Sequence, residues 1–294
     1  MDYNRLHIEE NCEIIIKKVR KMTTNLIAVD LDGTLLYDFD SLDESVCRFM
    51  KRLTAMGHKI VIATGRPFRS SRFVYDRFML DTPIINYNGG LVTHPKDASF
   101  PILNYTVRKE AIIDIFENNV DLIRNAFSEV KDNIYLFREE HEIDPLLHIT
   151  PDSEIHLGHL KDTLSEDPNG FIIIGKQGTG KAIESYIRQK YQGTVLARVW
   201  DLKGEYDSIV EVFTPEFNKG KALAYVAAYL GFPRSRVIAI GDGHNDIEML
   251  SFAALGVAVK GSHPDLLRAA DQVLEYDARD NAVVRFLSQY FALT

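Results

Sequence analysis

Short, almost continuously apolar runs alternate with amphipathic segments at both ends of the chain. The runs at 25–30, 59–63, 83–86, 236–240 and 255–259 have the composition of strands that are buried on both faces. Helices are predicted between them, at about 43–56, 219–230 and 247–254. Strands that alternate with helices in this order form βαβ units. We therefore predict an α/β fold with a Rossmann-like parallel sheet as its core.

The first predicted helix carries its own start and stop signals. Its apolar residues recur at spacings of three and four, so they share one face. Ser41 and Glu44 are spaced as a capping box, and Gly57 provides the left-handed residue that ends a helix. These signals predict a helix that packs one face on the sheet.

The middle of the chain, about Leu91 to Ser208, is less regular. Strand-like stretches at 133–137, 170–174, 194–200 and 208–213 alternate unevenly with helical ones. We predict an inserted α+β cap domain over 91–208, so that the core domain is discontinuous and consists of 24–90 and 209–294. Residues 1–23 are interpreted as an N-terminal arm, and Met22 as a possible alternative start.

Composition and charge restrict the classes of partner. The 294 residues include 34 Lys and Arg against 42 Asp and Glu, a formal net charge of −8. This balance argues against broad binding of nucleic acid or an anionic membrane. The two cysteines, Cys12 and Cys47, cannot build a disulfide framework or a four-ligand zinc site. No apolar stretch approaches the ~18 residues of a membrane span, and we expect a cytoplasmic protein.

The strongest chemical signal is the sequence Asp30-Leu31-Asp32-Gly33-Thr34, which follows a predicted buried strand. Open α/β sheets bind ligands at this end of their strands. Side chains two residues apart on an extended chain point the same way, so Asp30 and Asp32 should face one site. Two adjacent carboxylates repel each other unless a cation or a proton intervenes. The alternative is a solvated acidic turn.

Three other turns have residues suited to a metal or a phosphate. Gly241-Asp242-Gly243-His244-Asn245-Asp246 follows another buried strand, although Asp246 by itself is equally well explained as a helix N-cap. Asn218-Lys219-Gly220-Lys221 opens a helix, where lysines are unfavourable unless they share an anion with the helix end. Thr64-Gly65-Arg66 suits a phosphate, but it also suits any tight turn.

Taken in order, these four turns resemble the four motifs of the haloacid dehalogenase (HAD) superfamily. The long insert and the Asn88-Gly89-Gly90 turn before it resemble the Cof-type class IIB phosphatases of that superfamily. The resemblance extends over about 26–274. It implies a HAD core with a cap, and an enzyme that works through an aspartyl-phosphate.

The resemblance also implies roles for individual residues. Asp30 would be the nucleophile, and Asp32 the general acid and then the base. Mg²⁺ would lie between the Asp30 carboxylate, the Asp32 backbone carbonyl and Asp242. The phosphoryl oxygens would be held by Thr64, the backbone N–H of Gly65, Lys219 and Asn245, while Asp246 would orient Lys219 or a metal-bound water.

A cap of this size would exclude bulk water and large substrates. We expect a small phosphorylated metabolite, with sugar phosphates first by resemblance and a phosphomutase reaction as a further option. Neither nucleic acid nor membrane is expected as a partner, and the sequence does not indicate the oligomeric state. Arg66, Asn88, Arg138 and a group of cap histidines are the candidates for substrate selection.

Two other signals suggest different functions. The loop from Gly175 to Lys181 follows an apolar strand and resembles part of a phosphate-binding loop, but Ala182 replaces the hydroxyl residue that would hold Mg²⁺. A nucleotide-dependent enzyme is therefore the alternative class. The histidines at 141, 148, 156 and 159 suggest a zinc site, although no acid or cysteine spacing completes a ligand set. A protein that only binds phosphate is disfavoured because both Asp30 and Asp32 are present.

Overall fold

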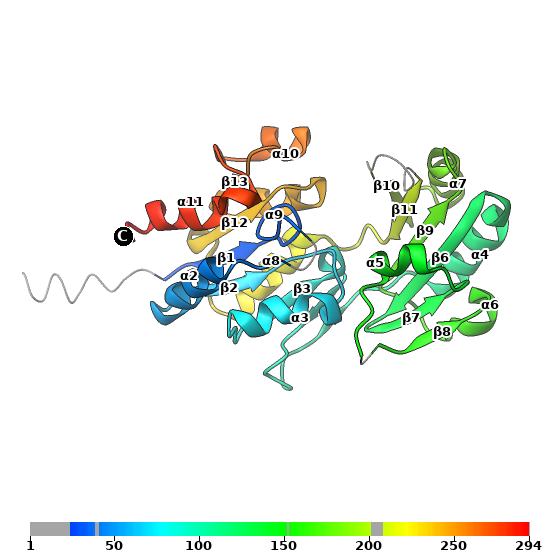
Figure 1. The fold of residues 1–294 in the computed structure, drawn as a ribbon, viewed down its shortest axis with the longest axis horizontal. Coiled ribbons are helices and arrows are strands. Elements are labelled where there is room, and N and C mark those ends of the chain that lie inside the picture. Colours follow the sequence, from blue (N-terminus) through cyan, green and yellow to red (C-terminus); the bar gives the residue numbers. More distant parts are fainter. Residues whose placement is uncertain (1–23, 39–40, 152, 201–207, 294) are drawn as a thin grey trace, which may run out of the picture.

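The computed structural model describes residues 24–38, 41–151, 153–200 and 208–293. The expected N-terminal arm, with Met22, lies outside these residues. The described chain forms two lobes that lie side by side, a core that includes both ends of the described chain and a cap built from its middle (Figure 1). Within the described residues, no helix is both long and apolar enough to cross a membrane.

The core is organised around a parallel five-stranded sheet. The strands follow the order β14-β13-β12-β1-β2, and β1 (Leu26–Val29) lies between its two hydrogen-bonded neighbours with all four residues buried. This burial on both faces is the reason why the strand is apolar at every position. The other strands are β2 (Lys59–Ile62), β12 (Val237–Gly241), β13 (Leu255–Ala258) and β14 (Gln272–Val273).

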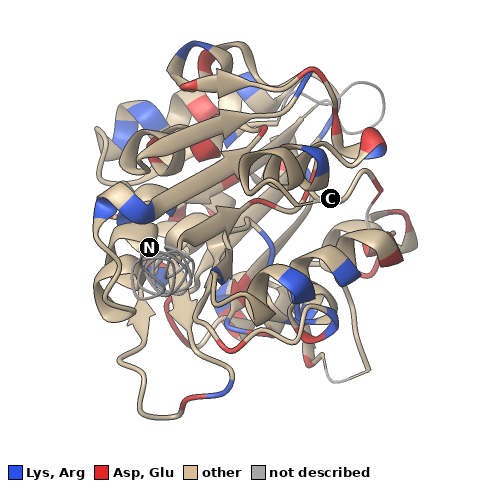
Figure 2. Ribbon diagram, turned by 90° about the vertical axis from the view of Figure 1, so that its left-hand side faces the viewer, with Lys and Arg blue, Asp and Glu red and all other residues tan. Residues whose placement is uncertain are grey.

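Helices cover both faces of the sheet, as predicted for an α/β fold. One face packs against α2 (Glu44–Ala55), α3 (Phe68–Arg77) and α11 (Ala282–Tyr290), and the other against α8 (Lys219–Tyr229), α9 (Ile247–Phe252) and α10 (Pro264–Ala269). Basic and acidic residues are interspersed along the helices and turns (Figure 2). The Rossmann-like α/β core is therefore confirmed.

The first helix starts differently from the prediction. Asp43, not Ser41, is the N-cap of α2, and its carboxylate accepts a hydrogen bond from the backbone N–H of Ser45 at 2.7 Å. Because the helix begins at Glu44, Ser41 lies two residues too early to cap it. Gly57 has the expected left-handed backbone, with φ +92°.

A small antiparallel sheet extends the core beyond β2. It contains β3 (Ile84–Asn86), β4 (Leu91–Thr93) and β5 (Leu103–Asn104), and one parallel bridge, between Ala63 and Ile85, joins it to the main sheet. Val92 and Phe100 are buried in the hydrophobic cluster beneath α8. Residues just after 90, which we expected in the cap, thus pack with the core.

The cap is a six-stranded sheet with helices mainly on one face. Its order is β10-β11-β9-β6-β7-β8, antiparallel except between β7 and β8. The strands are β6 (Ile123–Val130), β7 (Asn133–Leu136), β8 (Ile155–Leu157), β9 (Gly170–Gly175), β10 (Leu196–Val199) and β11 (Ile209–Phe213). The helices α4 (Lys109–Asn119), α6 (Leu160–Thr163) and α7 (Gly180–Tyr191) cover one face. Among the α-helices of the described residues, α5 (Asp144–Leu147) alone packs on the other face.

The cap also extends beyond the end predicted for it at residue 208. Strand β11 is hydrogen-bonded to β9 and β10, so it belongs to the cap sheet, and its predicted place in the core is wrong. An apolar run identifies a strand but not the sheet that it joins, since sheet membership depends on pairing with distant residues.

Buried polar contacts join the two lobes. The guanidinium of Arg69 on α3 forms an ion pair with Glu129 on β6, and also donates a hydrogen bond to the carbonyl oxygen of Leu147 at 2.8 Å. The carboxylate of Asp132 accepts a hydrogen bond from the backbone N–H of Arg69 at 3.0 Å. The face of the cap sheet that carries α5, called the open face below, is therefore held toward the carboxyl ends of the core strands.

Candidate active site

The centre of the site is the end of β1. Asp30 continues the sheet, since its backbone N–H donates to the carbonyl oxygen of Ile240 at 3.0 Å, and only 5% of the residue is exposed. Gly33 has φ +77°, and a Cβ there would lie 2.3 Å from a carboxylate oxygen of Asp242. Glycine therefore allows this turn to approach Asp242, whose carboxylate accepts a hydrogen bond from the Thr34 hydroxyl at 2.8 Å.

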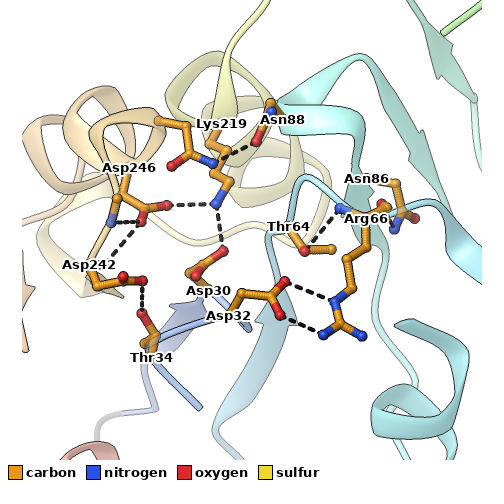
Figure 3. A network of polar contacts seen from close by, with 12 residues as sticks. Asp30, Asp32, Thr34, Thr64, Arg66, Asn86, Asn88, Lys219, Asp242 and Asp246 are labelled. Carbon is orange, nitrogen blue, oxygen red and sulfur yellow. Dashed lines mark hydrogen bonds and ion pairs between the residues drawn. The ribbon is translucent and has the colours of Figure 1, made fainter. Parts of the chain in front are cut away.

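Lys219 lies fully buried at the first turn of α8. Its Nζ donates to Asp30 Oδ1 at 2.6 Å and to Asp246 Oδ1 at 2.7 Å (Figure 3). The next residue, Gly220, packs so closely on α9 that a Cβ would lie 2.4 Å from the carbonyl oxygen of Glu248. Lys219 is thus not a surface lysine, and the anions that compensate its charge are two carboxylates of the protein.

The buried side chain of Asp246 closes the turn before α9 and does not cap α9 itself. Its Oδ2 accepts hydrogen bonds from the backbone N–H groups of Asp242 (3.1 Å) and Gly243 (2.9 Å), and it makes no side-chain bond that caps α9. Through these contacts Asp246 fixes both the turn that carries Asp242 and the position of Lys219.

Three carboxylates converge at this point. Oxygens of Asp30, Asp242 and Asp246 lie within 4.8 Å of one another, the only His, Cys, Asp or Glu group of this kind within the described ranges. Burial raises the pKa of Asp30 well above its usual range, although Lys219 opposes this, and burial with Asp246 raises the pKa of Asp242 to about 6.

The charge of the cluster favours a divalent cation. Burial alone would lower the pKa of Lys219, but Asp246 and Asp30 outweigh it and raise that pKa, so Lys219 carries one positive charge. Three carboxylates and one ammonium leave a formal surplus of two negative charges in a buried place. The carboxylates of Asp30 and Asp242, which we expected as metal ligands, both belong to this cluster, and so does that of Asp246. The carboxylate of Asp32 does not belong to it.

Asp32 is paired with Arg66. The guanidinium donates from Nε to Oδ2 at 2.8 Å and from Nη2 to Oδ1 at 2.5 Å. The Arg66 side chain is 3% exposed, whereas that of Asp32 is 48% exposed. Arg66, which we expected as a candidate for substrate selection, is therefore paired with the expected general acid.

A chain of amides links the expected phosphate-binding residues to the cap. Asn245 Nδ2 donates to Asn88 Oδ1, and Asn88 Nδ2 donates to Glu211 Oε1 of β11, both at 2.7 Å. The backbone N–H of Asn88 donates to the carbonyl oxygen of Thr64 at 3.0 Å, and Gly65 is exposed beside the Asn88 side chain. Lys219 thus contacts Asp30 directly, and Asn88 links Asn245 to the backbone of Thr64. Binding of phosphate by Thr64, Gly65, Lys219 and Asn245 stays a prediction.

Arg138 and three of the four cap histidines lie elsewhere. The guanidinium of Arg138 stacks over Phe137, 4.4 Å from its centroid. Phe137 packs in the cluster beneath the cap helices. His141 contacts Asp144, His156 on β8 stacks on Tyr135, and His159 pairs with Glu117. Only His148 is near the site, and burial together with the charges of Arg66 and Arg69 lowers its pKa to about 4.

The Gly175–Lys181 loop folds back on itself. The Thr179 hydroxyl donates to the carbonyl oxygens of Lys176 (2.6 Å) and Leu122 (3.1 Å), and Lys176 Nζ donates to the carbonyl oxygen of Asp121 at 2.6 Å. These groups are used within the protein, so the geometry gives no support to the nucleotide-dependent alternative.

The sequence does not predict the charged residues that join the core and the cap. Arg69, Glu129 and Glu211 are ordinary charged residues in amphipathic segments, and nothing nearby in the sequence distinguishes them. Their partners lie 60 or more positions away, and their role follows only from the packing of cap on core.

This fold and site define a capped α/β enzyme whose acidic centre is built around a buried lysine. The family model for haloacid dehalogenase-like hydrolase matches residues 27–287, so the chain belongs to that family. It is 35% identical over 274 residues to the 5-amino-6-(5-phospho-D-ribitylamino)uracil phosphatase YitU of Bacillus subtilis, covering 91% of this chain and 98% of that protein. The chain is thus a HAD-like phosphatase, as the sequence resemblance implied.

Solved structures share the whole architecture. A haloacid dehalogenase-like hydrolase from Bacteroides thetaiotaomicron has a TM-score of 0.76 at 22% identity, over 91% of this chain and all of that one. The HAD subclass IIB sugar phosphatase BT4131 has a TM-score of 0.73 at 21% identity, over 92% and 100%. The fold therefore agrees with the Cof-type, class IIB resemblance.

Proposed function

We propose that this phosphatase hydrolyses phosphate monoesters of small metabolites with the help of Mg²⁺, through an aspartyl-phosphate on Asp30. The observation that carries the proposal is the position of Asp30, buried at the end of β1 between Lys219 and the carboxylate of Asp242. A carboxylate fixed there can attack phosphorus, and cations around it can receive the phosphoryl oxygens.

The residues fit a magnesium ion. Carboxylate oxygens are the ligands that Mg²⁺ prefers, and the cluster has a surplus of negative charge in a desolvated place. Asp30 and Asp242 would hold the ion together with the backbone carbonyl of Asp32, while Asp246 keeps Asp242 and Lys219 in place. When bound, the cation would neutralise the repulsion between an anionic nucleophile and an anionic phosphate.

The protein's own groups account for both steps. In the first, an Asp30 oxygen forms a bond to phosphorus as the ester oxygen leaves, and Asp32 gives that oxygen a proton. In the second, Asp32 accepts a proton from water, the water oxygen bonds to phosphorus, and the bond to Asp30 breaks. Lys219, Thr64, the Gly65 N–H and Asn245 hold the phosphoryl oxygens, and the cap limits access of bulk water.

The Bacillus relative suggests the kind of substrate. Its name specifies a phosphate carried on a ribityl chain, and BT4131 is called a sugar phosphatase. We infer that polyol and sugar phosphates are the first substrates to test, with 5-amino-6-(5-phospho-D-ribitylamino)uracil among them. A phosphomutase with the same intermediate is distinguished by its product, since it would release an isomeric phosphate instead of inorganic phosphate.

The test is phosphate release from a panel of phosphorylated metabolites by the purified full chain. We expect turnover with Mg²⁺, loss with a chelator and recovery when Mg²⁺ is restored. The Asp30→Asn variant, purified in parallel, measures any contaminating phosphatase. Absence of release across sugar, polyol and nucleotide phosphates, or full activity with the chelator, would contradict the proposal.

A further inference from the structure

The open face of the cap sheet carries a pair of opposite charges above the site. Arg198 on β10 lies directly opposite Glu211 on β11, so both side chains stand on the same face. That face also carries Ile209, which packs in one cluster with Leu147 of α5. The side chains of Arg198 and Glu211 are 32% and 18% exposed, so both remain accessible to solvent.

Two successive hydrogen bonds connect Glu211 of the cap to the turn that carries Asp242 in the core. Its Oε1 accepts from Asn88, which in turn accepts from Asn245 at the turn that carries Asp242. Because Asn88 donates at one end of its amide and accepts at the other, its orientation is set by these two partners. These two contacts connect Glu211 of the cap to the turn that carries Asp242.

Hydrogen-bonding capacity remains unused in this pair. Arg198 Nη1 is 3.9 Å from Glu211 Oε2, too far for a hydrogen bond, and the guanidinium otherwise lies over the Phe213 ring. In the part of the chain that the structure describes, Arg198 donates no hydrogen bond and Oε2 of Glu211 accepts none. These donor and acceptor atoms are therefore available to a ligand.

We propose that Glu211 and Arg198 select the leaving group, and that they recognise neutral polyhydroxylated groups such as an alditol chain. A carboxylate only accepts hydrogen bonds and a guanidinium only donates them. A hydroxyl does both, so it can donate to Glu211 while it accepts from Arg198. A leaving group with a carboxylate beside Glu211 would be repelled instead. The inference rests on the proposed phosphatase function and names the substrate class for the same site.

The test compares three phosphate donors in the full chain. Ribitol 5-phosphate has a neutral hydroxylated leaving group, 3-phosphoglycerate has an anionic one, and acetyl phosphate has no hydroxyl. Glu211→Gln keeps an oxygen that can accept from Asn88 but removes the charge. We expect this variant to lower kcat/KM for ribitol 5-phosphate, relative to 3-phosphoglycerate, by roughly tenfold or more.

Arg198→Gln should reduce the preference for ribitol 5-phosphate over acetyl phosphate by a similar factor of roughly ten. Arg188→Gln, which removes the same charge from an exposed position of α7, is the matched control and should keep the wild-type ratios. Glu211→Ala removes the charge and also the oxygen that accepts from Asn88. This variant should therefore lower turnover of all three donors.

The outcomes separate this inference from the proposed function. If both Gln variants keep the wild-type ratios, or lower turnover of all three donors equally, the pair does not select the leaving group and the inference is overturned. If the wild-type enzyme releases phosphate from none of the donors nor from the wider panel, the phosphatase proposal fails instead.

Discussion

Arg66 binds Asp32 through two parallel hydrogen bonds, with Nε 2.8 Å from Oδ2 and Nη2 2.5 Å from Oδ1. The guanidinium is buried and is anchored further by the carbonyl oxygen of Ser70, which accepts from Nη1 at 3.3 Å. A planar fork of this kind fixes both the place and the rotation of a carboxylate. We therefore predict that Arg66 positions the group that we assign to proton transfer.

Arg66→Lys should lower kcat more than it changes KM. Lysine keeps the charge but cannot form the bidentate contact, so Asp32 would sample more orientations. We expect kcat to fall roughly tenfold, and roughly a hundredfold in Arg66→Ala. Steady-state kinetics on the best substrate of the panel would check this. A rise in KM with constant kcat would instead place Arg66 in substrate binding, the role first expected from the sequence.

Asp30→Asn should abolish turnover while the protein remains folded. An amide can still accept from Lys219, but it cannot act as the nucleophile. The expected loss is at least roughly a thousandfold in kcat, measured by phosphate release, with circular dichroism confirming the fold. For the wild-type enzyme, rapid quenching during turnover should yield a phosphoprotein that is stable in acid and is cleaved by hydroxylamine. Substantial activity in the variant would refute the nucleophile assignment.

Mg²⁺ should stabilise the wild-type protein but not Asp242→Asn. A ligand at a hundredfold excess over its Kd adds about 2.7 kcal/mol to the free energy of unfolding. The variant removes one of the charges of the cluster but keeps an oxygen that can accept from Thr34. Thermal unfolding with and without Mg²⁺ measures the difference in Tm. Equal shifts in both proteins would mean that the metal binds elsewhere.

Stability should fall as the pH drops below neutral because of His148. Burial and the nearby arginines lower the pKa of this histidine in the folded protein to about 4, from an ordinary 6.5. Between these values the unfolded chain binds the proton and the folded protein does not, so the free energy of unfolding decreases as the pH falls through this range. Because His148 is only partly buried, we expect a loss of about 1–2 kcal/mol between pH 7 and pH 5.

His148→Asn is the matched variant for this measurement, since asparagine tolerates the left-handed backbone at this position, where φ is +48°. Urea unfolding at several pH values should show a smaller loss in the variant than in the wild-type protein. The carboxylates of the site titrate in both proteins, so the difference between the two curves reports His148. Parallel curves would show that the histidine does not couple stability to pH.

Much of the core could be predicted from local patterns. The strands that end at Asp30 and before Asp242 are apolar at successive positions, and the helix that begins at Lys219 has an asparagine cap. Such signals are short in range and survive without tertiary information. The cap was less predictable, because β6 was not recognised and β11 was counted with the core, although it pairs with β9 and β10.

The sequence by itself therefore determined the four turns that build the catalytic edge, since each follows a recognisable strand or opens a recognisable helix. Only the tertiary structure decided which side chains meet there. It placed Lys219 between Asp30 and Asp246, set Arg66 against Asp32, and joined Asn88 to Glu211 across 123 positions. These pairs depend on the order of strands in the sheets and on the packing of cap against core, which no local pattern of residues encodes.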